Sequence, residues 1–263
     1  MFDVGGHAGD YARTFSDLLG PRGRVYSFEP HPEIYLDLED LAVHSHAANI
    51  FPFSYAVSDT IGEEVLYAGG NKDDPSTTRA STLCMEGANS DRLGADMRLF
   101  KVNTLTLDFF SKKLNVLPDL IKIDVEGAED RVFGGMLEVL QQSHATVLFE
   151  FSFPGSQGSL PRHFETLRSL GYRLCIANFV QFLGNPPFSW ENIADSSNGE
   201  LNEKMFSFVD DDVFNLQYLL CDVLAIKRVS HLRLLASDRL IPITEAVHMA
   251  VSLKQRTALP MIS

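Results

Sequence analysis

The chain has 263 residues, of which 45% are hydrophobic and 22% charged, so it can bury the core of one large domain or two small ones. Its 22 basic and 35 acidic residues give a formal net charge of −13, which argues against a general nucleic-acid binder and a polybasic membrane-surface protein. Three cysteines without a C-x-x-C spacing favour a reducing, cytoplasmic compartment, and we expect neither a secretory signal nor a membrane span.

The first forty residues alternate between strand and helix patterns. Apolar residues 1–4 predict a strand, and the helical spacing of apolar residues over 11–19 follows a glycine-rich turn. A second strand is predicted over 24–29 and a second helical face over 34–41. This alternation predicts an α/β fold with a parallel sheet and helices on its faces. Because a first strand of four residues is short for a central strand, we expect the natural chain to hold a segment before it.

The rest of the chain continues the α/β pattern with two long polar interruptions, at 69–95 and 183–212. We interpret residues 1–228 as one domain with two loop insertions, and residues 229–263 as a helical tail. The tail packs either on the domain or against a second copy in a homodimer. Strands are predicted at 51–57, 65–67, 120–124, 146–150, 172–177 and 218–226, and helices at 106–114, 128–140, 161–170 and 244–253.

The segment from Asp3 to Gly9, which reads D-V-G-G-H-A-G, lies between the first strand and the first helix. In an open α/β sheet this is where a nucleotide-type ligand binds, and glycines let the backbone approach it closely. Glu29 ends the second strand 20 residues after Gly9, where a carboxylate can accept hydrogen bonds from ribose hydroxyls. His7 stands where a dinucleotide fingerprint has glycine, which weakens the case for a dinucleotide. The spacing D-x-G-x-x-x-G instead resembles the first motif of class I methyltransferases, and this resemblance implies S-adenosyl-L-methionine (SAM) as the ligand.

A second group of acidic residues follows the predicted strand at 120–124. Asp124 and Glu126 come at its carboxyl end, and Glu129 lies in the first turn of the next helix. In a doubly wound sheet this strand neighbours the first one, so Asp124 should face the same cleft as the glycine turn. A sulfonium, a cationic substrate, Lys122 or a metal would offset the repulsion between these carboxylates, whereas Glu129 is equally explained by the positive end of its helix.

Five strings in this order resemble the FkbM family of SAM-dependent methyltransferases. They are D-V-G-G-H-A-G at 3–9, V-Y-S-F-E-P-H-P at 25–32, A-V-S-D at 56–59, T-L-D at 106–108 and I-K-I-D-V-E-G-A-E at 121–129. The resemblance covers residues 1–151, with a weaker match in the last strand around 222–226. It implies a Rossmann-like doubly wound class I methyltransferase sheet, mostly parallel with a reversed last strand, and mostly O-methylation of hydroxyls on polyketides, sugars or glycans.

The resemblance also implies where SAM binds. Residues of the glycine turn would line the methionine end of SAM, Glu29 and Pro30 would lie at the ribose, Ala56 to Ser58 near the adenine, and Asp124 at the floor of the cleft. The cofactor-binding residues that we expect are therefore Asp3, Gly5, Gly6, His7, Gly9, Glu29, Pro30, Ala56, Val57 and Asp124. The chain departs from the family at Gly6-His7, where Ala-Asn is frequent.

The expected reaction is transfer of a methyl group from SAM to a hydroxyl oxygen of a small molecule, sugar or glycan. A hydroxyl nucleophile benefits from a general base, and the candidates are Asp124, Glu126 and Glu150, which ends the strand predicted beside that of Asp124. We expect no metal, although Mg²⁺ between Asp124 and Glu150 would suit the ligand chemistry. His7 and His31 are further titratable groups near the cleft.

Two alternatives stay open. The sequence Asn185-Pro186-Pro187-Phe188 matches the N-P-P-[FY] loop of amino-methyltransferases, in which the asparagine holds the target amino group. Against it, the slot of the fourth strand is already filled by residues 121–124, and Pro-Pro turns arise easily. A SAM-binding partner subunit without catalysis is the other alternative. The acceptor would be selected by the two polar insertions, in which Leu83-Cys84-Met85 is an apolar spot that can cover the site.

Overall fold

The computed structural model describes residues 1–45, 48–69, 81–84, 97–153, 162–177, 182–183, 206–208, 219–227 and 240–242. The chain divides into two compact units, Met1–Ala145 and Thr146–Ser263. The first unit contains β1 (Phe2–Val4), α1 (Asp10–Leu19), β2 (Val25–Phe28), α2 (Ile34–His44), β3 (Ile50–Phe53), β4 (Ala56–Val57), β5 (Gly62–Ala68), β6 (Ser81–Thr82), β7 (Arg98–Leu105), α5 (Leu107–Leu114), β8 (Leu120–Ile123), α6 (Glu129–Gly134) and α7 (Leu137–Ser143).

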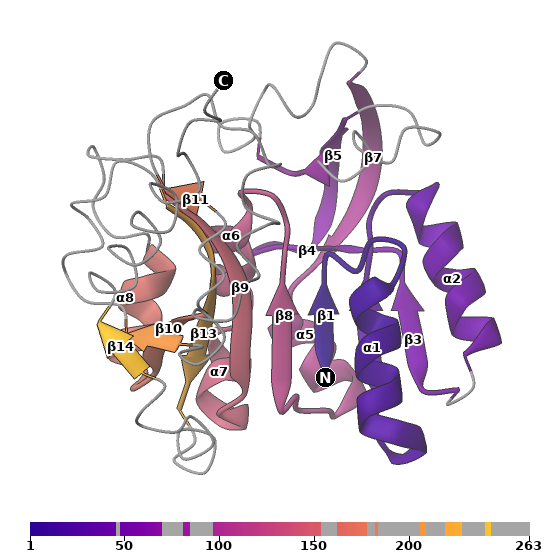
Figure 1. The fold of residues 1–263 in the computed structure, drawn as a ribbon. Helices are drawn as coiled ribbons and strands as arrows, with labels where there is room; N and C mark the ends of the chain where they lie inside the picture. The colour runs from indigo at the N-terminus through magenta and orange to yellow at the C-terminus, as the bar shows by residue number, and fades with distance from the viewer. Residues whose placement is uncertain are drawn as a thin grey trace, which may run out of the picture. The chain divides into compact units, whose positions relative to one another are not determined.

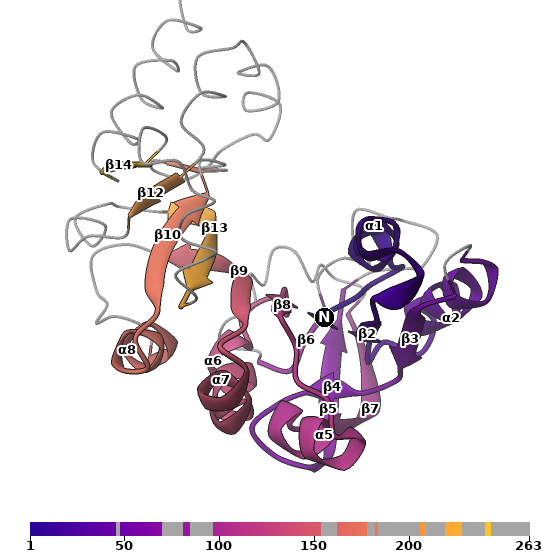
Figure 2. The same ribbon diagram turned by 90° about the horizontal axis from the view of Figure 1, so that it is seen from below.

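The first unit is built on a parallel sheet in the order β8-β1-β2-β3. Helices α1 and α2 lie on one face of this sheet and α5 lies on the other (Figures 1 and 2). Residues of β1 and β2 are buried on both faces, as expected for strands covered by helices on both sides. The predicted alternation of strands and helices, and the parallel sheet that it implied, are therefore confirmed.

Alternate residues of the central strands build two different cores. On the side of α1 and α2, Ala12, Val25, Leu38 and Ile50 form an aliphatic cluster. On the opposite side the ring of Phe110 in α5 contacts the rings of Phe2, Tyr26, Phe28 and Phe53 edge-on at 4.8–5.6 Å between centroids. These two cores fix the central strands, and with them the turns that follow their carboxyl ends.

A second sheet, in the order β4-β7-β5-β6, belongs to the same unit. The strand predicted over 51–57 is wrong as one element, because a break at 54–55 separates β3 in the first sheet from β4 in the second. Strand β7 was not predicted, and it pairs antiparallel with β5 from Arg98 to Thr104. Arg131 of α6 forms salt bridges with Asp59, which follows β4, at 3.0 Å and with Glu64 of β5 at 2.6 Å. These ion pairs connect α6 to the second sheet.

The helix predicted over 128–140 is two helices, α6 and α7, that are separated at Gly135-Met136. A side chain on Gly135 would overlap the carbonyl oxygen of Ser58, so only glycine allows this close approach. The carboxylate of Asp108 accepts hydrogen bonds from the amides of Glu138 and Val139 and thereby caps α7. Thr106 in turn caps α5, so the T-L-D string at 106–108 caps two helices.

The second unit contains β9 (Thr146–Phe153), α8 (Arg162–Ser169), β10 (Arg173–Ala177), β11 (Phe182–Leu183), β12 (Phe206–Phe208), β13 (Leu219–Ile226) and β14 (Leu240–Pro242). Strand β13 lies between β9 and β10 and is antiparallel to both, which confirms the reversed last strand. Helix α8 packs on β9, where the ring of Phe164 meets that of Phe149 at 5.7 Å.

Short strands also occur in segments predicted as loop or helical tail. Strand β12 lies within 183–212, and β14 lies within the predicted tail, where it pairs with β12. The predicted helix at 244–253 lies outside the described residues, and the domain boundary at 228 stays a prediction. Among the helices that the structure describes, none has the length and apolar character that a membrane crossing requires.

Candidate functional site

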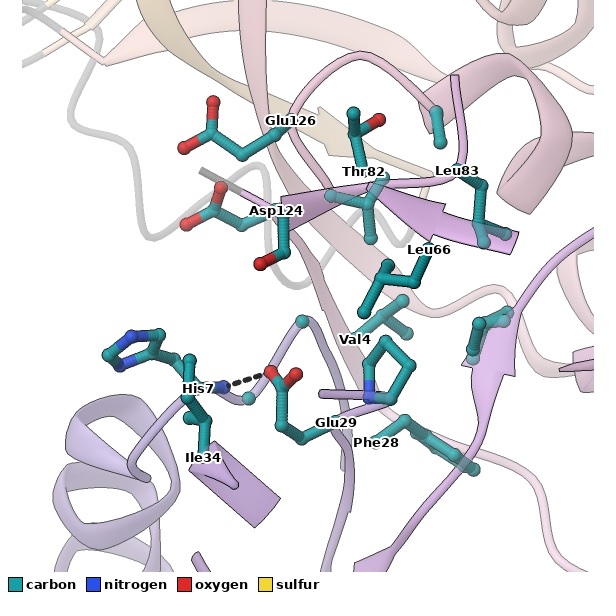
Figure 3. Close-up of a pocket in the computed structure, with 18 of the residues that line it drawn as sticks. Val4, His7, Phe28, Glu29, Ile34, Leu66, Thr82, Leu83, Asp124 and Glu126 are labelled. Atoms are coloured by element: carbon teal, nitrogen blue, oxygen red, sulfur yellow. Dashed lines mark hydrogen bonds between the residues drawn. The ribbon is translucent and has the colours of Figure 1, made fainter. Parts of the chain in front are cut away.

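A pocket opens in the first unit at the carboxyl ends of β1, β2 and β8 (Figure 3). It has a volume of about 1050 Å³, counting the space that opens to solvent. The second sheet supplies one wall. The described residues that line the whole pocket are Val4, Gly5, Gly6, His7, Asp10, Tyr11, Phe28, Glu29, Pro30, Ile34, Tyr55, Ala56, Val57, Leu66, Ser81, Thr82, Leu83, Lys122, Asp124, Val125, Glu126 and Ala128.

The glycine turn after β1 forms the floor of this pocket. The amides of Gly5 and Gly6 both donate to the carbonyl oxygen of Phe28, at 3.0 and 2.9 Å, which bends the chain across the end of β2. Gly5 has a φ of +76°, and a Cβ there would overlap the backbone carbonyl of Asp124. The turn therefore requires glycine at position 5 for both its conformation and its close approach to β8.

The Glu29 carboxylate lies at the centre of the pocket wall and is 5% exposed. One oxygen accepts from the amide of His7 at 2.8 Å (Figure 3). The other oxygen accepts from the amide of His31, also at 2.8 Å. Burial raises the pKa of Glu29 to about 7, although both amide hydrogen bonds and the charge of Lys122 act to lower it. Each carboxylate oxygen has a second lone pair, so Glu29 can accept further hydrogen bonds from a ligand.

His7 holds its amide toward Glu29 by adopting a left-handed backbone conformation, with a φ of +48°. Asparagine and histidine tolerate this conformation better than most residues. His31 acts elsewhere, because its Nδ1 accepts from the amides of Glu33 and Ile34, at 3.3 and 3.4 Å, in the first turn of α2. His31 does not line the pocket, and burial lowers its pKa, so it is a structural residue.

Lys122 is a pocket residue that the sequence indicated only as a source of positive charge. It is 5% exposed, and its Nζ donates to the carbonyl oxygen of Gly5 at 3.0 Å. The same nitrogen lies 3.4 Å from Asp124 Oδ2, 3.8 Å from Asp3 Oδ1 and 4.6 Å from the centre of the Tyr11 ring. The signal for this role in the sequence was a lysine that stands between two isoleucines, Ile121 and Ile123, within an apolar strand.

Asp3 lies within the sheet, next to the pocket but not in its lining. It pairs in register with Ser27 on one side and Lys122 on the other, and Ser27 Oγ donates to Asp3 Oδ2 at 2.7 Å. Asp3 is fully buried and does not line the pocket, and burial raises its pKa. Gly9 does not line the pocket either, because it starts α1 and faces Leu41 of α2.

The other predicted cofactor residues line the pocket together. Asp124 and Glu126 follow β8, and their carboxylates lie on the same side of the opening as His7 (Figure 3). Glu126 has a φ of +52° and Gly127 of +98°, so a tight left-handed turn sets this part of the rim. Glu150, the third predicted base, lies on β9 of the second unit in register with Asp222.

The opposite side of the pocket is apolar. Ala56 and Val57 of β4, Leu66 of β5 and Leu83 after β6 line it. Leu83 of the predicted cover lines the pocket, whereas Met85 lies outside the described residues, and the cover itself stays a prediction. The pocket therefore joins an apolar half, a buried carboxylate at its centre and a polar half that holds Lys122 and Asp124.

Comparison with known proteins identifies the family. A family model, the methyltransferase FkbM domain, matches residues 3–174. The chain belongs to the FkbM methyltransferase family. Membership of this family implies SAM as the cofactor, and together with the parallel sheet and reversed β13 it establishes the Rossmann-like class I methyltransferase fold. No curated protein matches this chain.

Several solved structures resemble this FkbM chain loosely. Methyltransferase FkbM from Methylobacillus flagellatus is 11% identical with a TM-score of 0.44, over 85% of this chain and 42% of that one. This chain thus spans less than half the length of that protein. Precorrin-6y C5,15-methyltransferase from Geobacter metallireducens is 13% identical with a TM-score of 0.39 (86% and 80% coverage), and Aeropyrum pernix fibrillarin with natively bound SAM is 14% identical at 0.38 (84% and 64%).

The residues of the pocket fit SAM. A Cβ on Gly5 would overlap the carbonyl oxygen of Asp124 and a Cβ on Gly6 would overlap Ser27 Oγ, so both glycines seat the turn closely against the ends of β8 and β2. The lone pairs left on Glu29 suit a vicinal diol such as that of ribose. The apolar half suits a purine ring, and the charges of the polar half suit the amino-acid end of the cofactor.

Proposed function

We propose that the chain transfers the methyl group of SAM to a hydroxyl oxygen of a small molecule, sugar or glycan. The observation that carries this proposal is the Glu29 carboxylate, which is buried at the centre of the pocket with both oxygens oriented by backbone amides. Membership of the FkbM family supports the same reaction class.

In this proposal the pocket holds the cofactor by its three chemically different parts. Glu29 binds the ribose hydroxyls, Ala56 and Val57 contact the adenine with Pro30 at the ribose side, and the turn at 5–7 faces the amino-acid end. When bound there, SAM supplies a methyl group on a sulfonium sulfur. The chain itself mainly positions this group and excludes water, which is where most of the rate gain of such a transfer arises.

The acidic rim of the pocket supports a hydroxyl acceptor. A hydroxyl loses its proton during transfer, so a carboxylate within hydrogen-bond reach accelerates the reaction. Asp124 and Glu126 line the pocket and are our candidates for this base, with Glu150 of β9 as the third. An anionic acceptor would be repelled, because the lining also includes Asp10 and Glu29 and, among the described residues, Lys122 is its one lysine or arginine.

The test is methyl transfer from SAM labelled in its methyl group to two panels, one of hydroxylated acceptors and one of amines. We expect label in the hydroxyl panel only, lost in Asp124→Asn or Glu126→Gln and kept in Asn185→Ala. Asn185 lies outside the described residues, so this variant addresses the amino-methyltransferase alternative directly. Label in the amine panel that disappears with Asn185→Ala would replace our proposal with that alternative. SAM binding without transfer to either panel would favour a partner subunit without catalysis.

A further inference from the structure

A buried lysine in a strand of a parallel sheet needs a physical reason. Lysine is almost never fully buried unless its charge is compensated, because removing the ammonium from water is costly. Lys122 is 5% exposed on β8, between two isoleucines that are fully buried. Its ammonium is therefore compensated by the groups around it, and those groups show what it holds in place.

The partners of Lys122 come from three separate segments. They are the Gly5 carbonyl of the glycine turn at 3.0 Å, the Asp124 carboxylate after β8 at 3.4 Å and the ring of Tyr11 in α1 at 4.6 Å. Behind it, Asp3 Oδ1 lies at 3.8 Å and has no hydrogen bond among the described residues. One ammonium thus joins the turn, the strand end and the first helix.

Three of these partners, Gly5, Tyr11 and Asp124, also line the pocket. The side chain of Asp124 is 40% exposed. A carbonyl oxygen has two lone pairs and a carboxylate has about four acceptor sites. Lys122, whose side chain is 6% exposed, therefore takes up part of the acceptor capacity of both groups, and the remaining capacity is open to a ligand.

We propose that Lys122 is a positioning residue that holds the Gly5 carbonyl and the Asp124 carboxylate as a pair of acceptors for the ammonium group at the amino-acid end of the cofactor. Two acceptors from different segments would otherwise be free to move apart or to turn toward water. Lys122 fixes both before the ligand arrives, which lowers the cost of ordering them on binding. This inference rests on the proposed function, because it takes SAM as the ligand of this pocket.

The test compares three ligands that share the nucleoside but differ at the other end. SAM and S-adenosylhomocysteine both carry the amino-acid end, whereas 5′-methylthioadenosine lacks it. Their dissociation constants are measured by calorimetry for the full chain and for Lys122→Met. We expect Lys122→Met to weaken SAM and S-adenosylhomocysteine alike, by about tenfold or more, and to change 5′-methylthioadenosine by less than about threefold. A merely structural role would weaken all three ligands together.

Two further variants keep the test decisive. Lys122→Met leaves the buried Asp3 without its cation and can destabilise the chain, so the double variant Lys122→Met with Asp3→Asn removes the charge pair together. Lys101→Met is the matched control, because this lysine lies on β7 outside the pocket with a side chain that is 70% exposed.

The outcomes separate this inference from the proposed function. Selective loss of the two ligands with an amino-acid end, in the single or the double variant and not in the control, supports the positioning role. Unchanged affinities, or equal losses for all three ligands in a folded variant, overturn it while SAM remains the ligand. If the unmodified chain binds none of the three ligands, the proposed function itself fails, and the inference fails with it.

Discussion

The contact between Gly6 and Ser27 offers a quantitative test of how the glycine turn is seated. The φ of Gly6 is not left-handed, so its backbone accepts alanine, but a Cβ there would overlap Ser27 Oγ. That hydroxyl donates to the buried Asp3 at 2.7 Å. Alanine at position 6 must therefore either displace the turn or turn the hydroxyl away from Asp3. We expect Gly6→Ala to cost about 2–4 kcal/mol, from overpacking and a lost hydrogen bond.

Removing the hydroxyl should relieve this conflict. With Ser27→Ala the nearest atoms to a Cβ on Gly6 become Asp3 Oδ2 at 3.2 Å and the Cβ of residue 27 at 3.4 Å, which small shifts accommodate. Ser27→Ala alone should cost about 1–3 kcal/mol, because it leaves an oxygen of Asp3 unpaired. The double variant should then cost little more than Ser27→Ala, so the coupling energy should be close to the full cost of Gly6→Ala, about 2–4 kcal/mol.

The assay is urea unfolding followed by circular dichroism on the four members of this double-mutant cycle. Gly62→Ala is the control, because no atom lies within 4 Å of a Cβ at that exposed position. If the costs of Gly6→Ala and Ser27→Ala add to within about 0.5 kcal/mol, the two residues are not in conflict and the described seating of the turn is wrong.

Three further predictions concern the floor, the wall and the second sheet. Gly5→Ala should cost about 2 kcal/mol more than Gly20→Ala in unfolding experiments, because both have left-handed φ but only the first overlaps backbone; equal costs would contradict the close approach to β8. The pKa of Glu29 is raised from 4.5 to about 7, so its contribution to stability is full below pH 4.5 and is lost as the pH rises to about 7. Relative to Glu29→Gln, which does not titrate there, the unfolding free energy should fall by about 3 kcal/mol over that window, and a flat difference would exclude the raised pKa. Arg131→Met should cost about 1–2 kcal/mol in unfolding experiments and the exposed Lys101→Met less than about 0.5 kcal/mol; similar losses would show that the Arg131 cluster does not hold the second sheet.

The sequence predicted the parallel sheet because its strands are short apolar runs bounded by glycine or proline, and its helices repeat at helical spacing. It did not predict β7, in which the exposed Lys101 and Asn103 alternate with the more buried Phe100, Val102 and Thr104. It also joined α6 and α7, because the apolar pattern continues through Gly135. The break there depends on Ser58 and Asp108, which are distant in sequence, and so no local pattern shows it.

The sequence predicted those parts of the candidate site that depend only on residues at the ends of strands. The glycines, Glu29 and Asp124 follow strand ends, and the pocket unites them as expected, apart from Gly9. Asp3 was expected in the pocket wall, but its strand position turns it into the sheet, toward Ser27. The roles of Lys122 and His31 depend on partners from other segments, which a single sequence does not place.

The central claim is that the pocket at the ends of β1, β2 and β8 binds SAM. The most direct measurement is calorimetric titration of the chain and of Glu29→Ala with SAM, with NAD⁺ as the comparison ligand. We predict saturable binding of SAM and not of NAD⁺, and a large loss of SAM affinity in a Glu29→Ala variant that remains folded. A folded chain that binds no SAM, or an unchanged affinity in Glu29→Ala, would contradict the assignment of this pocket.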